Sequence, residues 1–278
     1  MNELGIIGLV LVAVTFLVSY KGFKDPVYFD RHLFRVKDIL YRRQYQRLLS
    51  SGFLHVGWVH LLLNVATFYC FSGSLEASVG YGNFLLIYFA SLLGGNLFSL
   101  LLHRHDAQYS AVGASGAISG LVFASIALYP DMGVGLFDFY LPGWLYGLLY
   151  VVYSAYGISA RRDNIGHDAH LGGGLVGLLV VVALEPALLL TNYLAIGAIV
   201  GPTLVFLYLL LKNPAAGALG SFFSAAPGYQ SLDDRYHSQQ QQQQAHLDAL
   251  LDKINRKGFD SLSAREKQEL KELSRWWK

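Results

Sequence analysis

Long apolar runs separated by short polar segments fill the first 211 residues of the chain. A membrane-crossing helix needs about 17 to 25 mostly apolar residues, and stretches of this length predict seven spans. They cover residues 4–20, 59–75, 83–102, 113–129, 135–156, 168–184 and 187–211. The sequence LEPA, which contains Pro186, is all that separates the last two, so one long kinked segment is the alternative to two spans.

Composition supports a membrane protein. Hydrophobic residues make up 54% of the chain, charged residues make up 14%, and the mean hydropathy is positive. These values exclude an ordinary water-soluble globular domain. No convincing small-residue cleavage site follows the first apolar run, which favours a retained helix over a signal peptide. The single cysteine, Cys70, excludes an intramolecular disulfide framework and is interpreted as a packing residue.

The chain changes character after residue 211. Residues 212–244 include the stretch DDRYHSQQQQQQ, which cannot bury a core and predicts a polar, glutamine-rich linker. Residues 245–278 predict a small helical hairpin. Its signals are an apolar stripe, a terminating glycine and the capping box SARE, formed by Leu247, Leu250, Leu251, Ile254, Gly258 and Ser263 to Glu266. The hairpin is either a protein-binding module or a solvated appendage.

Polar side chains inside membrane spans are costly, so they are functional candidates. The second span opens with WVHLLLN, which puts His60 and Asn64 on one helix face. The fourth opens with GASG around Ser115, and the sixth with AHLGGGLVG around His170. Because these three spans enter the bilayer from the same side, the four residues are expected to converge at one depth.

These residue types fit acyl transfer. Serine is a weak nucleophile unless a base accepts its proton, and a neutral imidazole can do this and then protonate the leaving amine. Ser115 and His170 are therefore the candidate nucleophile and general base. The developing oxyanion also needs hydrogen-bond donors, which the amide of Asn64, the imidazole of His60 and the backbone N–H of Ser115 can supply.

Small residues surround these candidates. Gly113 and Gly116 lie on either side of Ser115, and Gly173 and Gly177 follow His170 at i+3 and i+7. Small faces let membrane helices approach closely. Membrane glycines are more often packing residues than catalytic ones, and a buried histidine alone is more often structural. The ordered conjunction of three motifs, each opening a span of the same parity, favours the functional interpretation.

Other ionisable residues are weaker candidates. Asp168 precedes His170 by two positions and so faces another way on a helix, which argues against a conventional triad. His55 is interpreted as organising the loop before the second span. His103, His105 and His167 lack metal-site spacing and thiol or carboxylate partners, so we expect no metal and no cofactor.

Over residues 45–185 the chain resembles the rhomboid family of intramembrane serine proteases, through SGFLHVGWVHLLLN, GASG and AHLGGG. The resemblance implies an all-α polytopic membrane protein with a six-helix core, here extended by a seventh C-terminal helix and the helical tail. It implies Ser115 as nucleophile, His170 as general base and close packing at Gly173. The implied oxyanion site consists of His60, Asn64 and the backbone N–H groups of Ala114 and Ser115. The expected domains are a membrane domain over 1–211, the linker over 212–244 and the tail over 245–278.

The chain departs from the family pattern at one position near the nucleophile, and its similarity to rhomboids extends to the closing segment. Some family members carry an aromatic residue four positions after the nucleophile, stacked on the catalytic histidine, whereas this chain has Ser119. The orientation of His170 must then come from elsewhere. The closing segment is similar to a small module on some bacterial rhomboids, and we expect a multi-pass protein of a bacterial cytoplasmic (inner) membrane.

The function expected from these residues is hydrolysis of peptide bonds in or near the transmembrane segments of other membrane proteins. The expected partners are transmembrane substrates, the lipid bilayer and a possible protein partner of the tail, without nucleic acid. One alternative is a rhomboid-like pseudoprotease that binds membrane clients without cleavage, which the presence of both Ser115 and His170 opposes. Another is a channel or transporter, for which paired charges or broken helices at the midplane are not evident.

The positions of the Lys and Arg residues predict how the protein is oriented in the membrane. In the seven-span arrangement all 21 Lys and Arg residues fall on one side of the membrane. Basic loops normally stay in the cytoplasm, which predicts that the site opens toward the cytosol, whereas rhomboids of the usual orientation open the other way. The bias is weaker evidence if the first loop is an amphipathic element on the membrane surface and because long tails count less.

Overall fold

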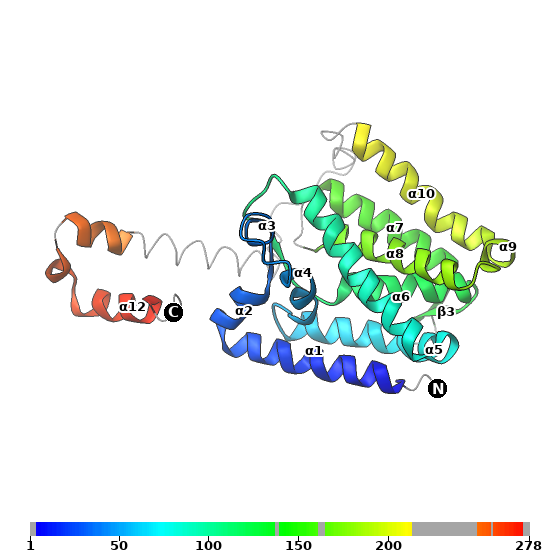
Figure 1. Ribbon diagram of the computed structural model, residues 1–278, viewed down its shortest axis with the longest axis horizontal. Helices are drawn as coiled ribbons and strands as arrows, with labels where there is room; N and C mark the ends of the chain where they lie inside the picture. Colours follow the sequence, from blue (N-terminus) through cyan, green and yellow to red (C-terminus); the bar gives the residue numbers. More distant parts are fainter. Residues whose placement is uncertain (1–3, 137–138, 161–164, 213–248, 257, 275–278) are drawn as a thin grey trace.

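The computed structural model describes residues 4–136, 139–160, 165–212, 249–256 and 258–274 (Figure 1). Its long helices are α1 (Ile6–Lys24), α5 (Trp58–His103), α6 (Ser115–Leu128), α7 (Gly143–Ala160), α8 (His167–Leu184) and α10 (Tyr193–Lys212). Helix α5 is broken at Gly80, whose φ of 79° is non-helical, and Figure 1 shows its two limbs turning back on each other. The predicted all-α membrane fold is confirmed.

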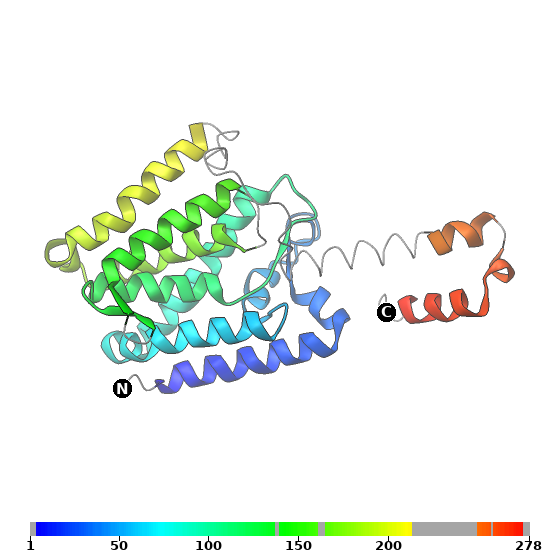
Figure 2. The ribbon, with the colours of Figure 1, turned by 180° about the vertical axis from the view of Figure 1, so that it is seen from behind.

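Length and composition identify four of the described helices as able to cross a membrane, namely α1, α5, α8 and α10. Helix α6 has only 14 residues and is buried from Gly116 to Ala127. It packs against both α5 and α8 at the centre of the helical assembly (Figure 2). Because protein surrounds it, α6 is apolar on every face. The outer helices instead expose apolar side chains such as Leu17, Leu62 and Leu194, which suits contact with lipid.

Two predicted span boundaries are wrong. Residues predicted to begin the span 135–156 lie in an antiparallel hairpin of β3 (Gly133–Leu136) and β4 (Phe139–Pro142), so α7 starts at Gly143. The last span, predicted from 187, is preceded by the short helix α9 (Leu188–Thr191). The amide of Asn192 then donates to the carbonyl of Ala127 at 2.8 Å, and α10 starts at the next residue. Helices α8 and α10 are therefore two elements.

The segment between α1 and α5 is a folded cap on one end of the bundle. It contains α2 (Pro26–His32), β1 (Phe34–Arg35), α3 (Val36–Leu40), α4 (Arg47–Ser50) and the 3-10 turn η1 (Ser51–Phe53), with β1 paired to β2 (Ser110–Ala111). The buried carboxylate of Asp38 forms ion pairs with Arg35, Arg42 and Arg47 at 3.4, 3.1 and 3.2 Å. Asp38 thereby neutralises part of the positive charge from which the membrane orientation is predicted.

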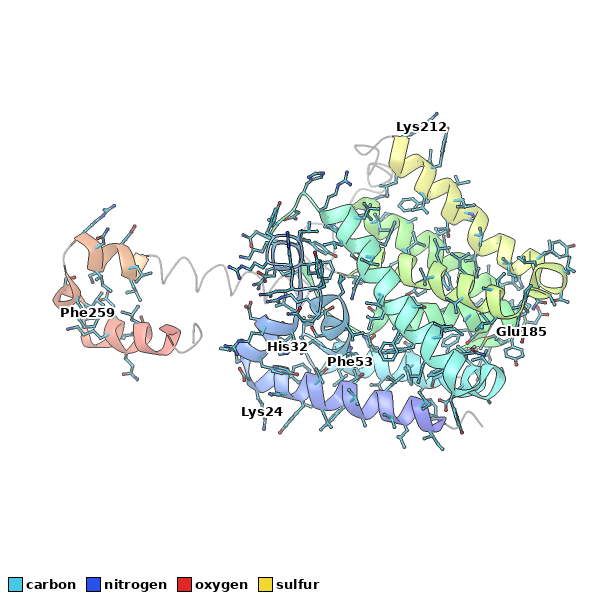
Figure 3. All side chains as sticks on the ribbon, in the orientation of Figure 1. Lys24, His32, Phe53, Glu185, Lys212 and Phe259 are labelled. Carbon is cyan, nitrogen blue, oxygen red and sulfur yellow. The ribbon has the colours of Figure 1, made fainter. Side chains whose placement is uncertain are left out.

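Charged ends of the bundle are visible in Figure 3. Lys24 ends α1 and Lys212 ends α10, and both lie at helix ends that point away from Glu185, which follows α8. The predicted placement of basic residues toward one end therefore holds for these labelled positions.

The tail contains a helix over 249–256, the 3-10 turn η4 (Phe259–Ser261) and α12 (Ala264–Ser274). The predicted terminating role of Gly258 is confirmed: its φ is 80°, and its N–H donates to Ile254 O at 2.8 Å. The capping box is also confirmed, with Ser263 N–H donating to Glu266 Oε2 at 2.7 Å and Glu266 N–H donating to Ser263 Oγ at 3.3 Å.

The predicted apolar stripe of the tail is only partly buried. Leu250 is buried, whereas Leu251 is 49% exposed. Leu247 and the predicted linker, apart from Lys212, lie outside the described residues. The division of the chain at 211 and 244 stays a prediction.

Candidate active site

The two catalytic candidates lie at neighbouring helix starts. Ser115 is the first residue of α6, and His170 lies in the first turn of α8. A Cβ placed on Gly116 would lie 3.2 Å from the carbonyl oxygen of Ala169. Since Ser115 precedes Gly116 and His170 follows Ala169, this backbone contact places the two candidates at adjoining positions.

Glycines make this close contact possible. A Cβ on Gly173 would collide with the carbonyl oxygen of Gly116, and one turn deeper a Cβ on Gly177 would collide with the backbone of Gly120. The second limb of α5 joins the same contact, because a Cβ on Gly173 would also lie 3.0 Å from Ser91 O. Backbone packing without intervening side chains therefore sets the separation of the helices that carry the two candidates.

Gly113 brings the imidazole of His60 toward the serine. Its φ of 135° is one that residues with a side chain rarely adopt. A Cβ at this position would lie 3.0 Å from both Cε1 and Nε2 of His60, and 3.6 Å from Ser115 Oγ. The His60 imidazole and the Ser115 hydroxyl therefore both lie close to the space that a side chain at position 113 would fill.

The remaining oxyanion candidates lie beside them. Asn64 is 8% exposed, and its Nδ2 donates to His60 O at 2.9 Å, which occupies one of the two hydrogens of that amide group. The N–H of Ala114 is directed at Nε2 of His55 over a long 3.5 Å. This weak contact leaves the Ala114 N–H easily diverted to a better acceptor.

His55 lies closer to the site than the sequence indicated. It is fully buried, its ring lies 4.8 Å from that of His60, and its Nδ1 is 2.9 Å from Ser19 Oγ on α1. Burial, aided by the charge of His60, lowers the pKa of His55 to about 3. The neutral ring then donates from Nδ1 to Ser19, which itself donates to Phe53 O, and accepts from Ala114 at Nε2. Ser19 and His55 are 36 residues apart, so no short motif signals this link.

No hydrogen bond joins Ser115 to His170 within the described part of the chain. The imidazole of His170 lies instead beside two rings, those of Tyr150 at 6.1 Å and His167 at 6.0 Å between centroids. Catalytic hydrogen bonds are often long before substrate binds and tighten in the complex.

Asp168 does not face His170. Its carboxylate pairs with Nε2 of His103 at 3.1 Å and receives the hydroxyl of Tyr109 at 3.4 Å. The rings of His103 and Tyr109 stack at 3.6 Å. This arrangement agrees with the expectation that Asp168 and His170 lie on different helix faces, and it joins the start of α8 to the end of α5. The prediction that His103 has no carboxylate partner is wrong, because Asp168 reaches it from α8.

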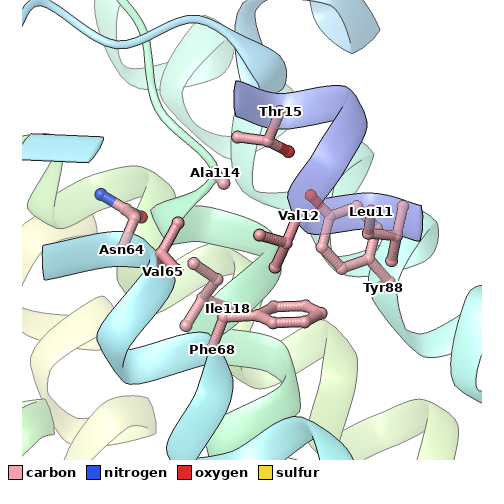
Figure 4. A pocket seen from close by; sticks show the side chains of 9 residues that line it. All are labelled: Leu11, Val12, Thr15, Asn64, Val65, Phe68, Tyr88, Ala114 and Ile118. Carbon is pink, nitrogen blue, oxygen red and sulfur yellow. The ribbon is translucent and has the colours of Figure 1, made fainter. Parts of the chain in front are cut away.

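A small pocket opens next to the oxyanion candidates (Figure 4). Apolar side chains from α1, α5 and α6 form most of its wall, with Asn64 and Thr15 as polar members. The lining residues are Leu11, Val12, Thr15, Asn64, Val65, Phe68, Tyr88, Ala114 and Ile118. Because Ala114 directly precedes Ser115, this apolar space adjoins the candidate nucleophile.

Comparison with known proteins identifies the family. Residues 42–187, just over half of the 278-residue chain, match the model of the rhomboid domain. The chain therefore belongs to the rhomboid family, and it is an integral membrane protein. Residues 230–276 match a second family, which is described as a family of unknown function (DUF6576).

Individual relatives come from several kinds of organism. The chain is 34% identical to Rhomboid protein 1, mitochondrial, of Saccharomyces cerevisiae over 137 residues, which are 48% of this chain and 40% of that protein. It is 26% identical over 191 residues to RHOMBOID-like protein 12, mitochondrial, of Arabidopsis thaliana, which are 63% of this chain and 56% of that protein. It is 29% identical over 141 residues to Rhomboid protease GluP of Bacillus subtilis, which are 51% of this chain and 26% of that protein. The chain thus spans between about a quarter and somewhat more than half of these relatives.

Proposed function

We propose that this rhomboid-family protein is an intramembrane serine endopeptidase with Ser115 as nucleophile and His170 as general base. The observation that carries the proposal is the glycine contact between α6 and α8, which brings the first turns of the two helices together where these side chains begin. That relatives of this chain include a protein named as a rhomboid protease adds support.

The chemistry follows from the residues. Ser115 Oγ attacks the carbonyl carbon of the scissile peptide bond while His170 takes the hydroxyl proton. The oxyanion that forms accepts hydrogen bonds from donors on its side of Ser115, namely His60, Asn64 and the N–H groups of Ala114 and Ser115. The bond to nitrogen then breaks as His170 returns the proton to the leaving amine, and water releases the acyl group by the same steps.

The proposed substrates are membrane proteins whose transmembrane helix is locally unstable. A helical peptide bond is shielded by its neighbours, so helix-breaking residues lower the cost of presenting an extended bond to Ser115. Replacing the Gly or Pro residues of a cleaved segment by Leu should therefore slow its cleavage. A bacterial cytoplasmic membrane is the proposed location, since the tail is similar to a module of bacterial rhomboids.

Labelling by a fluorophosphonate serine probe tests the proposal in the detergent-solubilised protein. Ser115→Ala and His170→Ala should each reduce the labelling rate by about 10³-fold or more, because nucleophile and base act as a unit. Ser125→Ala, which changes another buried serine of α6, and His105→Ala, which changes an exposed histidine, are the matched controls. A folded wild-type protein that neither labels nor cleaves transmembrane substrates would favour the client-binding pseudoprotease.

A further inference from the structure

A chain of hydroxyl groups connects the start of α6 to α7. Ser119 Oγ donates to the carbonyl oxygen of Ser115 at 2.7 Å, and the same Oγ lies 2.6 Å from the hydroxyl of Tyr150. A hydroxyl has a single proton to donate. Since Ser119 gives its proton to Ser115 O, the hydroxyl of Tyr150 must donate to Ser119.

Tyr150 is also held through its ring. The ring packs edge-on against Phe123 of α6, with 5.5 Å between centroids, and lies 6.1 Å from Tyr146 one turn earlier in α7. The ring also lies beside the imidazole of His170, at 6.1 Å and tilted by 38°. Separations of this size are typical of interacting aromatic pairs. One tyrosine from α7 therefore contacts the helices that carry both catalytic candidates.

The imidazole of His170 needs such a neighbour. Glycine packing fixes the backbones of α6 and α8, but it leaves the two side-chain torsions of His170 undetermined. The ionisable groups around the imidazole are Tyr150 on α7, His167 and Asp168 on α8, and His60 on α5. Asp168 is bonded to His103 and Tyr109, so it does not anchor the ring.

We infer that Tyr150 is a positioning residue for His170, with its hydroxyl anchored through Ser119 to the backbone of Ser115. The inference rests on the proposed function, because it assigns a neighbour to the proposed base. In this arrangement the ring limits the rotation of the imidazole, and the two hydroxyl groups fix the ring relative to the nucleophile. Ser119 thereby makes room for an aromatic ring supplied by another helix.

Four variants separate the ring from the hydroxyl: Ser119→Ala, Tyr150→Phe, Tyr150→Leu, and Ser119→Ala combined with Tyr150→Phe. The measurements are the second-order rate of fluorophosphonate labelling across pH, with thermal unfolding measured in parallel. Tyr208→Phe removes a hydroxyl from an exposed ring of α10 and serves as the matched control.

We expect Tyr150→Phe to slow labelling by about 5-fold, the effect of one hydrogen bond. Ser119→Ala should slow it at least as much, because it also removes the bond to Ser115 O. The double variant should be no slower than Ser119→Ala by more than about 2-fold, because Ser119→Ala already removes the bond that Tyr150→Phe removes. Tyr150→Leu should slow labelling by about 10-fold or more and move the midpoint of the pH profile, since the ring is lost as well.

Two results would overturn the inference. One is a wild-type protein that labels while all four variants keep its rate and pH profile. The other is slower labelling that merely parallels a lower unfolding temperature, with the pH profile unchanged, which is what a purely structural contact would produce. A wild-type protein that is folded and does not label would overturn the proposed function, and this inference with it.

Discussion

Glu76 is a buried carboxylate inside the apolar helix α5 that no sequence motif indicates. It is 2% exposed, and its oxygens accept from the N–H groups of Ile7 and Gly8 at 3.1 and 2.9 Å. The first N–H groups of a helix have no partner within the helix, so a carboxylate placed there satisfies them and suits the helix dipole. Glu76 falls one residue beyond the predicted span 59–75, so the search for polar residues inside spans does not include it.

Removing this carboxylate should destabilise the protein. Glu76→Leu leaves the buried N–H of Gly8 without an acceptor, at a cost of about 1 to 3 kcal/mol, and also removes the acceptor of the partly buried N–H of Ile7. Glu76→Gln retains one acceptor oxygen and should lose less. Thermal unfolding in detergent measures the difference, with Glu185→Gln as an exposed control. Equal unfolding temperatures for wild type and Glu76→Leu would contradict this role.

Some residues of the candidate site can be predicted from sequence motifs, and others cannot. Ser115 and His170 lie in two separate compact motifs, each within seven positions of its own glycines, so short-range spacing is enough to single them out. Tyr150 is 31 positions from its hydrogen-bond partner Ser119. One tyrosine among 18 in an apolar chain has no pattern that distinguishes it, and only tertiary packing shows its position.

At the scale of elements, the contact between α6 and α8 should tolerate no added methyl group. Gly173→Ala would push a Cβ into the carbonyl of Gly116. Overpacking of this kind typically costs about 1 to 3 kcal/mol, and the shift of the helices should separate Ser115 from His170. We expect a lower unfolding temperature and a labelling rate reduced by about 10-fold or more, as a displacement near 1 Å can produce.

Gly197→Ala is the matched control for this prediction. Gly197 lies in α10, and a Cβ there would meet nothing within 4 Å. Labelling and unfolding should both stay at the wild-type values. If Gly173→Ala behaved like Gly197→Ala, close packing at the helix crossing would not be what sets the geometry of the site.

The tail provides a prediction of pH dependence. Hydrogen bonds from Lys253 and from the Ser263 N–H lower the pKa of Glu266 from 4.5 to about 2. A carboxyl whose pKa is lower in the folded state stabilises that state above pH 4.5, and the stabilisation is lost as the pH falls from 4.5 through 2. The link between the helix at 249–256 and α12 should therefore weaken over this interval.

Carbon chemical shifts of the Glu266 carboxyl, recorded by NMR on the full-length protein, would follow its titration. The midpoint should lie near pH 2 in wild type and move toward 4.5 in Lys253→Met, because the hydrogen bond from the Lys253 ammonium, the largest cause of the lowered pKa, is removed. Lys267→Met removes a charge from the same helix and is the control. A wild-type midpoint near 4.5 would show that Lys253 does not hold this carboxyl in solution.

Apolar runs predict the membrane helices well because the bilayer demands a long uninterrupted stretch. They fail for residues 133–142, where Val134, Leu136 and Phe139 extend the apolar run into α7 although the backbone forms a hairpin. They also say little about the cap between α1 and α5. The ion pair of Asp38 with Arg47 joins residues 9 positions apart, so helical periodicity, which fits its pairs with Arg35 and Arg42, does not reveal it.

At the scale of the whole molecule, the basic residues predict orientation. The starts of α5, α6 and α8, and with them the candidate site, lie at the end of the bundle that carries Lys24 and Lys212 (Figure 3). If basic segments stay in the cytoplasm, this end faces the cytosol. Asp106 and Asp131 are exposed residues at opposite ends of the bundle and provide the positions to test.

Single cysteines at these positions, in a Cys70→Ala background, would report their side of the membrane. A membrane-impermeant maleimide should label Asp131→Cys in intact cells and label Asp106→Cys only after the cells are opened. The reverse pattern would place the site on the outer face and would contradict the orientation predicted from the basic residues.

The short length of α6 determines which part of the protein feels the thickness of the bilayer. Fourteen residues span about 21 Å at 1.5 Å per residue, whereas the hydrocarbon core is about 30 Å thick. Lipid would have to thin around such a helix, but α6 is enclosed by protein and touches none of it. Hydrophobic mismatch therefore acts on α1 and α10, whose exposed faces meet the acyl chains. Changing the acyl-chain length should tilt these outer helices while the central helix keeps its depth.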